Sequence, residues 1–172
     1  MPLFESGAIL FYLAEKTGSG LLPKTPELKY RTMQWLMFQM GGVGPMFGQA
    51  NHFRGYAVDK HAYSVERYTK EAGRLMGVLD TRLGESEYLA GGVYTIADIA
   101  TWPWLRNLHR QGQDLNDFPN LKRWFDAIAA RPAVQRGIQV LADKARPANV
   151  GMTDEERKWM FGEEQYKAHK RA

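Results

Sequence analysis

The sequence predicts an all-α protein, built as a bundle of helices. Three observations support this class: apolar residues recur at helical spacing through most of the chain, capping patterns precede apolar runs, and the alternation typical of strands is almost absent. Only Pro2–Phe4 has the character of a short strand. The 172 residues are 44% hydrophobic and 24% charged, which is typical of a globular domain and unlike a disordered chain.

The first predicted helix covers Ala8–Lys16 and ends at Gly18, because glycine accepts the left-handed conformation that follows many helices. The segment Thr17–Pro26 is rich in Gly, Ser and Pro and is expected to be a linker between a small N-terminal piece and the main body. A second helix is expected over Glu27–Met40, and the glycines and proline of Gly41–Pro45 are expected to bend or break it.

The longest predicted helix lies between Ala62 and Leu83, where apolar residues recur at alternating spacings of three and four. A loop follows over Gly84–Val93. Thr95 and Asp98 then form a capping-box pattern that opens another helix, in which the threonine hydroxyl accepts a backbone N–H and the carboxylate reaches back. Pro103 lies inside this helix, so a kink is expected there.

Two more helices are expected in the second half of the body. One begins near Pro119 and ends at Pro132, and a short one runs to Leu141. The remaining residues are charge-rich and poor in aliphatic side chains. A second capping pattern at Thr153–Glu156 predicts a terminal helix that carries Trp159–Phe161.

Composition excludes several kinds of function. Cysteine is absent, which excludes disulfides, thiolate metal sites and covalent catalysis by a protein thiolate within these residues. The net charge of +4 is scattered, so it indicates nucleic acid only weakly and fits small anionic ligands equally well. The longest apolar run, Ala8–Ala14, is far shorter than the about 18 residues of a membrane span, and no basic region precedes it. We therefore expect a soluble cytoplasmic protein.

Common catalytic and metal-binding patterns do not occur. The four histidines, at positions 52, 61, 109 and 169, show no metal-ligand spacing, so no metal site is predicted. Neither a G-x-S-x-G elbow nor a phosphate-binding P-loop is present. No motif by itself forms a complete active site.

Glu5 and Ser6 are the local feature that most favours a ligand. A serine at a helix start can serve as N-cap, and its hydroxyl together with the first free N–H groups can hold a carboxylate. Glu5 supplies a negative charge suited to an ammonium group. The pair therefore fits an α-amino-acid zwitterion. The simpler alternative is a capped helix without a ligand.

Several segments, in this order, resemble glutathione transferases: Glu5–Leu10, Tyr12–Lys16, Gln34–Leu36, Gly44–Met46, Glu66–Tyr68, Tyr94–Asp98, Trp102–Trp104 and Arg131–Val134. The combination is similar to the bacterial Nu class and Ure2-like proteins, which act mainly as glutathione-dependent disulfide-bond reductases. The resemblance runs from Leu3 to about Leu141. It implies the helical C-terminal bundle of a transferase, preceded by the last strand and helix of a thioredoxin-like domain.

The resemblance also implies an organisation. Residues 1–18 would be the remnant of the thioredoxin-like, glutathione-binding domain, 19–26 the linker, 27–142 the helical C-terminal domain, and 143–172 a polar tail with a terminal helix. The family's thiolate-stabilising groups precede this region, so the catalytic residues are unknown here. An apolar face of the first helix, which in the family packs on a sheet, is expected to be exposed.

The family pattern implies roles for individual residues. Glu5 and Ser6 would hold the γ-glutamyl ammonium and carboxylate of glutathione. Gln34 and Arg67 would approach bound glutathione, partly across a dimer interface, and an arginine fork suits a carboxylate. Gln39 is a weaker candidate for the same task. The alternatives are a solvated helix face for Gln34 and an ion pair with the glutamate four residues on for Arg67.

Two further sets of residues receive different roles. The border of a second-substrate pocket is expected at Met46, Gln49, His52 and Trp104. Thr95 and Asp98 match a folding element of the family and are assigned a structural capping role rather than catalysis.

The leading hypothesis is an enzyme that uses the thiol of glutathione for disulfide exchange or for conjugation to electrophiles. Glutathione or oxidised glutathione would be a co-substrate, no cofactor would be bound permanently, and the protein would be a homodimer without nucleic-acid or membrane partners. The alternative is a non-catalytic helical binding or dimerisation module that lacks the thiol-activating half. A basic nucleic-acid binder is supported only by the isoelectric point of about 9.3.

Overall fold

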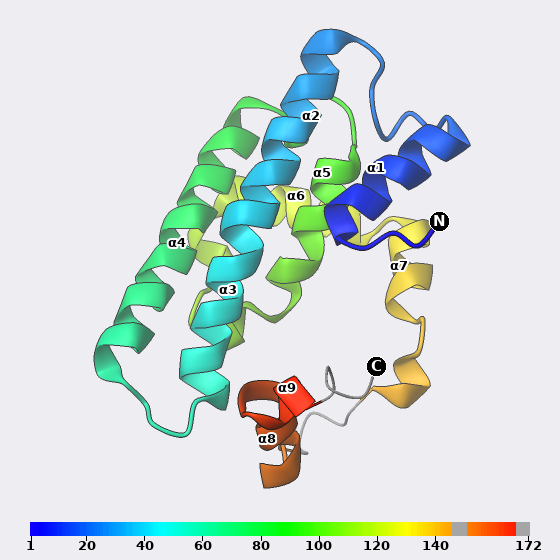
Figure 1. Cartoon of the computed structure of the whole chain (residues 1–172). Coiled ribbons are helices and arrows are strands. Elements are labelled where there is room, and N and C mark those ends of the chain that lie inside the picture. The colour runs from blue at the N-terminus through cyan, green and yellow to red at the C-terminus, as the bar shows by residue number, and fades with distance from the viewer. Residues whose placement is uncertain (146–150, 168–172) are drawn as a thin grey trace. The chain divides into compact units, whose positions relative to one another are not determined.

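The computed structural model describes residues 1–145 and 151–167, and these form two compact units, Met1–Arg131 and Pro132–Ala172. Within the described ranges the fold is all-helical and no strand forms (Figure 1). The predicted all-α class is therefore confirmed. Pro2–Phe4, expected as a short strand, lies outside any regular element. A single strand is not stable without a neighbouring strand, and none is formed beside it.

The first unit contains six α-helices joined partly by π-helical and 3₁₀ turns. The α-helices are α1 (Ser6–Thr17), α2 (Pro26–Phe38), α3 (Gly44–Asn51), α4 (Ala62–Glu85), α5 (Ile96–Thr101) and α6 (Pro119–Ala129). The π-helical turns are η1 (Gln39–Val43) and η2 (His52–Tyr56), and the 3₁₀ segments are η3 (Trp102–Gln111) and η4 (Leu115–Asp117). Most of these bounds agree closely with the helices that the sequence predicts. The helix expected to continue through Pro103 with a kink instead ends at Thr101, and Pro103 lies in the first turn of the 3₁₀ segment that follows.

The second unit is smaller and is described by itself. It contains α7 (Pro132–Ile138), a 3₁₀ turn η5 (Ala142–Lys144), α8 (Asp154–Phe161) and α9 (Glu164–Lys167). The capping box expected before α8 is present, with Thr153 accepting from the N–H of Glu156 at 3.2 Å. The parts of the predicted polar tail at 146–150 and 168–172 lie outside the described residues.

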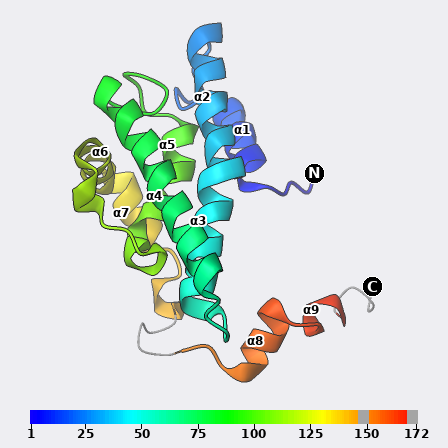
Figure 2. The same ribbon diagram turned by 90° about the vertical axis from the view of Figure 1, so that its left-hand side faces the viewer.

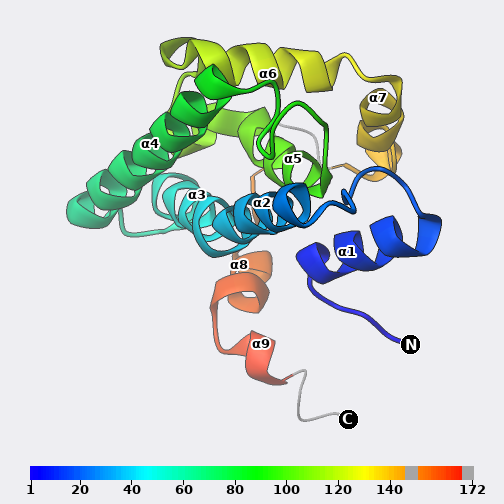
Figure 3. The same cartoon turned by 90° about the horizontal axis from the view of Figure 1, so that it is seen from above.

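The core of the first unit lies around α4 and α5. In Figures 1 and 2, α2 leads through a π-turn into α3, and α4 runs antiparallel beside them. Seen from above, α5 lies between α2 and α6, and α1 flanks α2 (Figure 3). The inward side of α4 is buried through Ala72, Leu75, Met76, Leu79 and Leu83. The three–four periodicity that predicted this helix therefore marks the face that is removed from water.

The segment between α2 and α3 differs from the expected bend or break. The helix continues through Gly41–Pro45, but its hydrogen-bond pattern widens at η1 before α3 begins at Gly44. Pro45 lies in the first turn of α3, where a proline removes no bond that the helix needs. The glycines therefore widen the helix rather than ending it.

A buried capping box at the start of α5 joins several elements of the first unit. The Asp98 carboxylate accepts hydrogen bonds from the Thr95 N–H at 2.9 Å, the Leu89 N–H at 3.0 Å and the Trp124 indole N–H at 2.9 Å. The Thr95 hydroxyl also donates to it at 3.1 Å. Burial raises the pKa of the Asp98 carboxyl, and these donors oppose that rise. The arrangement ties α5 to α6 and to the preceding loop.

Tyr94 contributes to the alkaline stability of this unit. Burial raises its pKa to about 12, although the Arg131 guanidinium, 4.0 Å from the ring centroid, favours the ionised form. In the unfolded chain a tyrosine ionises near pH 10. The stabilisation that the neutral phenol provides is therefore complete below about pH 10 and is lost as the pH rises to about 12.

We expect the unfolding free energy of the native chain, relative to Tyr94→Phe, to fall over this pH range. Denaturant titrations at several alkaline pH values measure this difference, and the phenylalanine variant keeps the ring beside Arg131 while removing the titration. A difference that stays constant up to about pH 12 would show that burial does not control this group.

Candidate functional site

The candidate site lies at the N-terminus of α1, where the backbone is strained. Glu5 has φ 69° and ψ 115°, a left-handed conformation that glycine adopts more easily. Residues held in such conformations cluster at ligand sites, because the surrounding structure must enforce them. The expectation that Ser6 caps the helix is wrong. Glu5 occupies the cap position, no side chain caps the end, and Ser6 is the first helical residue. Both side chains are exposed.

The π-turn η1 forms the neighbouring wall of this corner. The Met40 sulfur lies 3.9 Å from the Ser6 hydroxyl oxygen. A Cβ at Gly7 would lie 3.3 Å from the same sulfur, so the helix start and the π-turn approach each other closely. Met40 is a residue that sequence reasoning missed. The sequence feature that could have indicated this contact is Gly7, which follows the serine and permits the close approach. In addition, π-turns often occur at functional sites.

Gln39, Gly44 and Trp104 meet beside the same π-turn. The Gln39 side chain is buried, and a Cβ at Gly44 would lie 2.9 Å from its Nε2 atom and 3.2 Å from Cζ2 of Trp104. Trp104 remains 37% exposed. The structure therefore brings together a residue expected at the glutathione site and one expected at the second-substrate pocket.

Gln34 and Arg67 are not joined to this corner by any hydrogen bond in the described part of the chain. Gln34 is exposed on α2. Arg67 on α4 forms the expected alternative ion pair, with its Nη1 3.5 Å from Oε2 of Glu71, and half of its side chain stays exposed. Glu71 also accepts two bonds from Arg74, at 2.8 and 2.7 Å, and the Arg74 guanidinium lowers the pKa of Glu71.

The other residues expected at a second-substrate pocket follow one side of α3 and its C-terminal end. Met46, Gln49 and His52 are spaced by three, which places them on a common face. Met46 and His52 are half-buried and Gln49 is exposed. The His52 ring lies 5.1 Å from that of Phe53, which stacks on Tyr68 of α4 at 5.4 Å. These stacked rings attach the second π-turn to α4.

Two features are absent from the part of the chain that is described: a cluster of metal-ligating side chains and a helix able to cross a membrane. Over residues 1–145 and 151–167 no cluster of three His, Asp or Glu side chains is arranged to hold a metal ion. None of the helices described there is both long and apolar enough to span a bilayer.

Comparison with known proteins identifies the family to which this helical fold belongs. The family model of the glutathione S-transferase C-terminal domain matches residues 34–132. The chain belongs to the glutathione S-transferase family. The resemblance found in the sequence motifs is therefore confirmed.

Among known proteins, this chain is similar to two disulfide-bond oxidoreductases of Escherichia coli (strain K12). It is 49% identical to YfcG over 138 residues, which is 80% of this chain and 64% of that protein. It is 41% identical to YghU over 142 residues, covering 78% of this chain and 49% of that protein. The chain thus spans between about half and two thirds of the length of these relatives.

Two solved structures of similar proteins contain the tripeptide. A glutathione transferase from Pseudomonas putida, with one glutathione disulfide bound per subunit, is 46% identical with a TM-score of 0.76, over 81% of this chain and 63% of that one. A glutathione transferase from Burkholderia graminis, with two glutathione molecules bound per subunit, is 48% identical with a TM-score of 0.73. The match covers 81% of this chain and 60% of that one.

Proposed function

We propose that this chain is the helical part of a glutathione-dependent enzyme that exchanges thiols and disulfides. The similar proteins named as disulfide-bond oxidoreductases, and those crystallised with glutathione or its disulfide, support this proposal. Glutathione would be a co-substrate, with no cofactor bound permanently. Conjugation of the same thiol to electrophiles is the related activity.

The observation that carries the proposal is the strained corner at Glu5 and Ser6. The N-terminus of a helix offers unpaired N–H groups and a partial positive charge, which favour a carboxylate. We assign the γ-glutamyl carboxylate of glutathione to the Ser6 hydroxyl and these N–H groups, and the γ-glutamyl ammonium to the Glu5 carboxylate. The left-handed conformation of Glu5 supports this assignment, because such strain persists where a ligand site needs it.

The proposed chemistry is disulfide exchange with both attacking thiols supplied by glutathione. A glutathione thiolate attacks one sulfur of a substrate disulfide, forming a mixed disulfide and releasing the other substrate sulfur as a thiolate. A second glutathione thiolate then attacks the glutathione sulfur of the mixed disulfide. This releases the remaining substrate thiolate and forms oxidised glutathione. The absence of cysteine from these 172 residues agrees with this route.

The remaining residues take roles around that ligand. We place Gln34, Arg67 and Gln39 against the rest of glutathione, partly across the dimer interface. The second substrate would lie beside Met46, Gln49, His52 and Trp104. The proximity of Gln39 to Trp104 at Gly44 supports one continuous site.

We also propose a homodimer in the cytoplasm. The exposed apolar side chains Tyr30 and Met37 on α2 and Tyr63 on α4 support an apolar interface that involves these helices. Sedimentation of the 172-residue chain across a range of concentrations tests the dimer.

Calorimetric titration with glutathione and with oxidised glutathione tests the proposed site. We expect Ser6→Ala and Glu5→Gln each to weaken binding about tenfold or more, since each removes a charge-assisted contact. Glu87→Gln, an exposed loop glutamate, is the matched control and should leave the affinity unchanged. Binding that Ser6→Ala and Glu5→Gln leave intact would show that glutathione does not occupy this corner.

The second candidate is a non-catalytic helical module for binding or dimerisation. The apolar side chains exposed on α1, Ile9, Tyr12 and Leu13, favour it, because they offer a surface for a protein partner. Turnover of a small disulfide by the chain would exclude this candidate. Glutathione binding without turnover would favour it.

A further inference from the structure

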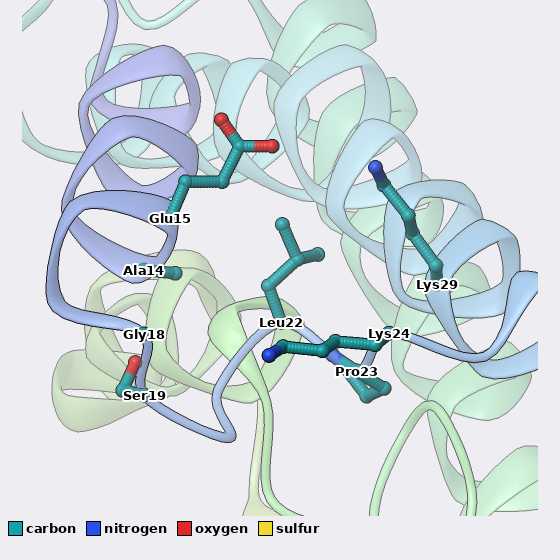
Figure 4. A pocket seen from close by; sticks show the side chains of 8 residues that line it. All are labelled: Ala14, Glu15, Gly18, Ser19, Leu22, Pro23, Lys24 and Lys29. Atoms are coloured by element: carbon teal, nitrogen blue, oxygen red, sulfur yellow. The ribbon is translucent and has the colours of Figure 1, made fainter.

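A pocket lies at the opposite end of α1 from the corner formed by Glu5 and Ser6. It has a volume of about 270 Å³, is open to solvent on one side, and is lined by the last turn of α1, the linker and the first turn of α2 (Figure 4). Because α1 has 12 residues, its two ends are separated by about 16 Å. A ligand in this pocket would therefore occupy a site distinct from that of Glu5 and Ser6.

The floor of the pocket is apolar and fixed by the fold. Ala14 and Leu22 are buried beneath it. The linker that carries Leu22 is attached to α5, since the Ile96 N–H donates to the Leu21 carbonyl at 3.0 Å. Gly18, at φ 61°, ends α1 and donates to the Glu15 carbonyl at 3.2 Å. These two backbone hydrogen bonds fix the course of the chain on either side of the pocket floor.

Opposite charges surround this floor. Glu15 extends over the pocket from α1, at the helix end that carries the partial negative charge (Figure 4). Lys24 and Lys29 line it from the linker and from α2. None of these three side chains forms an ion pair anywhere in the described chain. Charged groups of both signs are therefore available to a ligand.

Ser19 supplies an independent indication. Ser19 is among the residues that line the pocket, and its hydroxyl oxygen is buried without a hydrogen-bond partner among the described residues. Buried polar groups are rarely left unsatisfied, so such a hydroxyl indicates a missing partner.

We propose that this pocket binds a small α-amino acid with an apolar side chain. The ammonium group would lie at Glu15 and the C-terminal end of α1, and the carboxylate would lie between Lys24 and Lys29. The side chain would rest on Leu22. Such a ligand would bridge α1 and α2 across the linker, and it would stabilise the folded chain by an amount that grows with the logarithm of its concentration above its Kd.

Three probes that differ by one charged group test this proposal by calorimetry on the 172-residue chain. L-leucine carries both charges, isocaproate lacks the ammonium and isoamylamine lacks the carboxylate. We expect L-leucine to bind at least tenfold more tightly than either of the others. Equal binding of all three, or no binding of L-leucine, would overturn the proposal.

Substitutions of the charged residues that line the pocket test whether L-leucine binds there. Glu15→Gln, Lys24→Gln and Lys29→Gln should each weaken L-leucine binding about tenfold. Lys16→Gln is the matched control, because Lys16 is next in sequence but lies 5.4 Å from the Tyr12 ring centroid and does not line the pocket. An affinity that the three pocket variants leave unchanged would overturn the assignment.

One crossed experiment separates this proposal from the proposed function. Ser6→Ala should leave the L-leucine affinity intact while it weakens glutathione binding. Loss of L-leucine binding in Ser6→Ala would place the amino acid at the glutathione corner and overturn the second site. L-leucine binding by a chain that does not bind glutathione would leave this proposal standing and remove the other.

Discussion

Replacing Asp98 with alanine is expected to lower the unfolding free energy of the first unit by about 3–5 kcal/mol. The Asp98 carboxylate is buried and accepts hydrogen bonds from two backbone N–H groups, the Thr95 hydroxyl and the Trp124 indole. Alanine would leave these donors buried without an acceptor. The loss should therefore exceed that of an ordinary helix cap, because the bonds to Leu89 and Trp124 join separate elements.

Urea denaturation followed by tryptophan fluorescence measures this loss. Asp114→Ala is the matched control: Asp114 also caps a short helix, accepting from the Asn116 N–H at 2.9 Å, but it is exposed. Its removal should cost about 1 kcal/mol or less. If both variants lost the same free energy, burial of Asp98 would contribute nothing beyond capping.

Replacing Gly44 with alanine is expected to destabilise the fold by about 1–3 kcal/mol. The added methyl group would lie 2.9 Å from the Gln39 amide nitrogen and 3.2 Å from the Trp104 ring. Gln39 is buried, so its amide has little room to move away. The same change should alter the fluorescence of Trp104 and weaken glutathione binding if Gln39 contacts that ligand.

Gly48→Ala provides the comparison within the same helix. A Cβ at Gly48 meets no atom within 4 Å, so alanine should stabilise α3 by about 0.4–1 kcal/mol. Thermal and urea denaturation of the two variants should therefore give changes of opposite sign. Equal tolerance of alanine at both positions would show that the contact around Gly44 relaxes freely.

Much of the helical architecture could be predicted because its causes are local. The three–four spacing of apolar residues identified α4, and Gly18 identified the end of α1. The Thr95–Asp98 pattern identified the start of α5, since both partners of a capping box lie within four residues. Such features depend on neighbours in sequence and not on the tertiary fold.

The site was less predictable because it depends on distant contacts. Met40 contacts Ser6 across 34 residues, and no local pattern marks that pair. The cap expected at Ser6 failed because the position depends on the unusual backbone of Glu5, which residue type does not indicate. The roles assigned to Gln34 and Arg67 came from the family resemblance and remain predictions. In the structure Arg67 pairs with Glu71, which is the alternative that the sequence also offered.

The π-turn η1 has a consequence for how this protein can change in length. A π-turn accommodates one residue more than the α-helix that would replace it, and one residue corresponds to a rotation of about 100° around the axis. A chain shortened by one residue in Gln39–Val43 would therefore return to α-helical winding while α3 keeps its orientation. Phe47 and Ala50, both fully buried, would still face the core. A deletion within α3 itself has no such turn to absorb it and would rotate the residues that follow by about 100°.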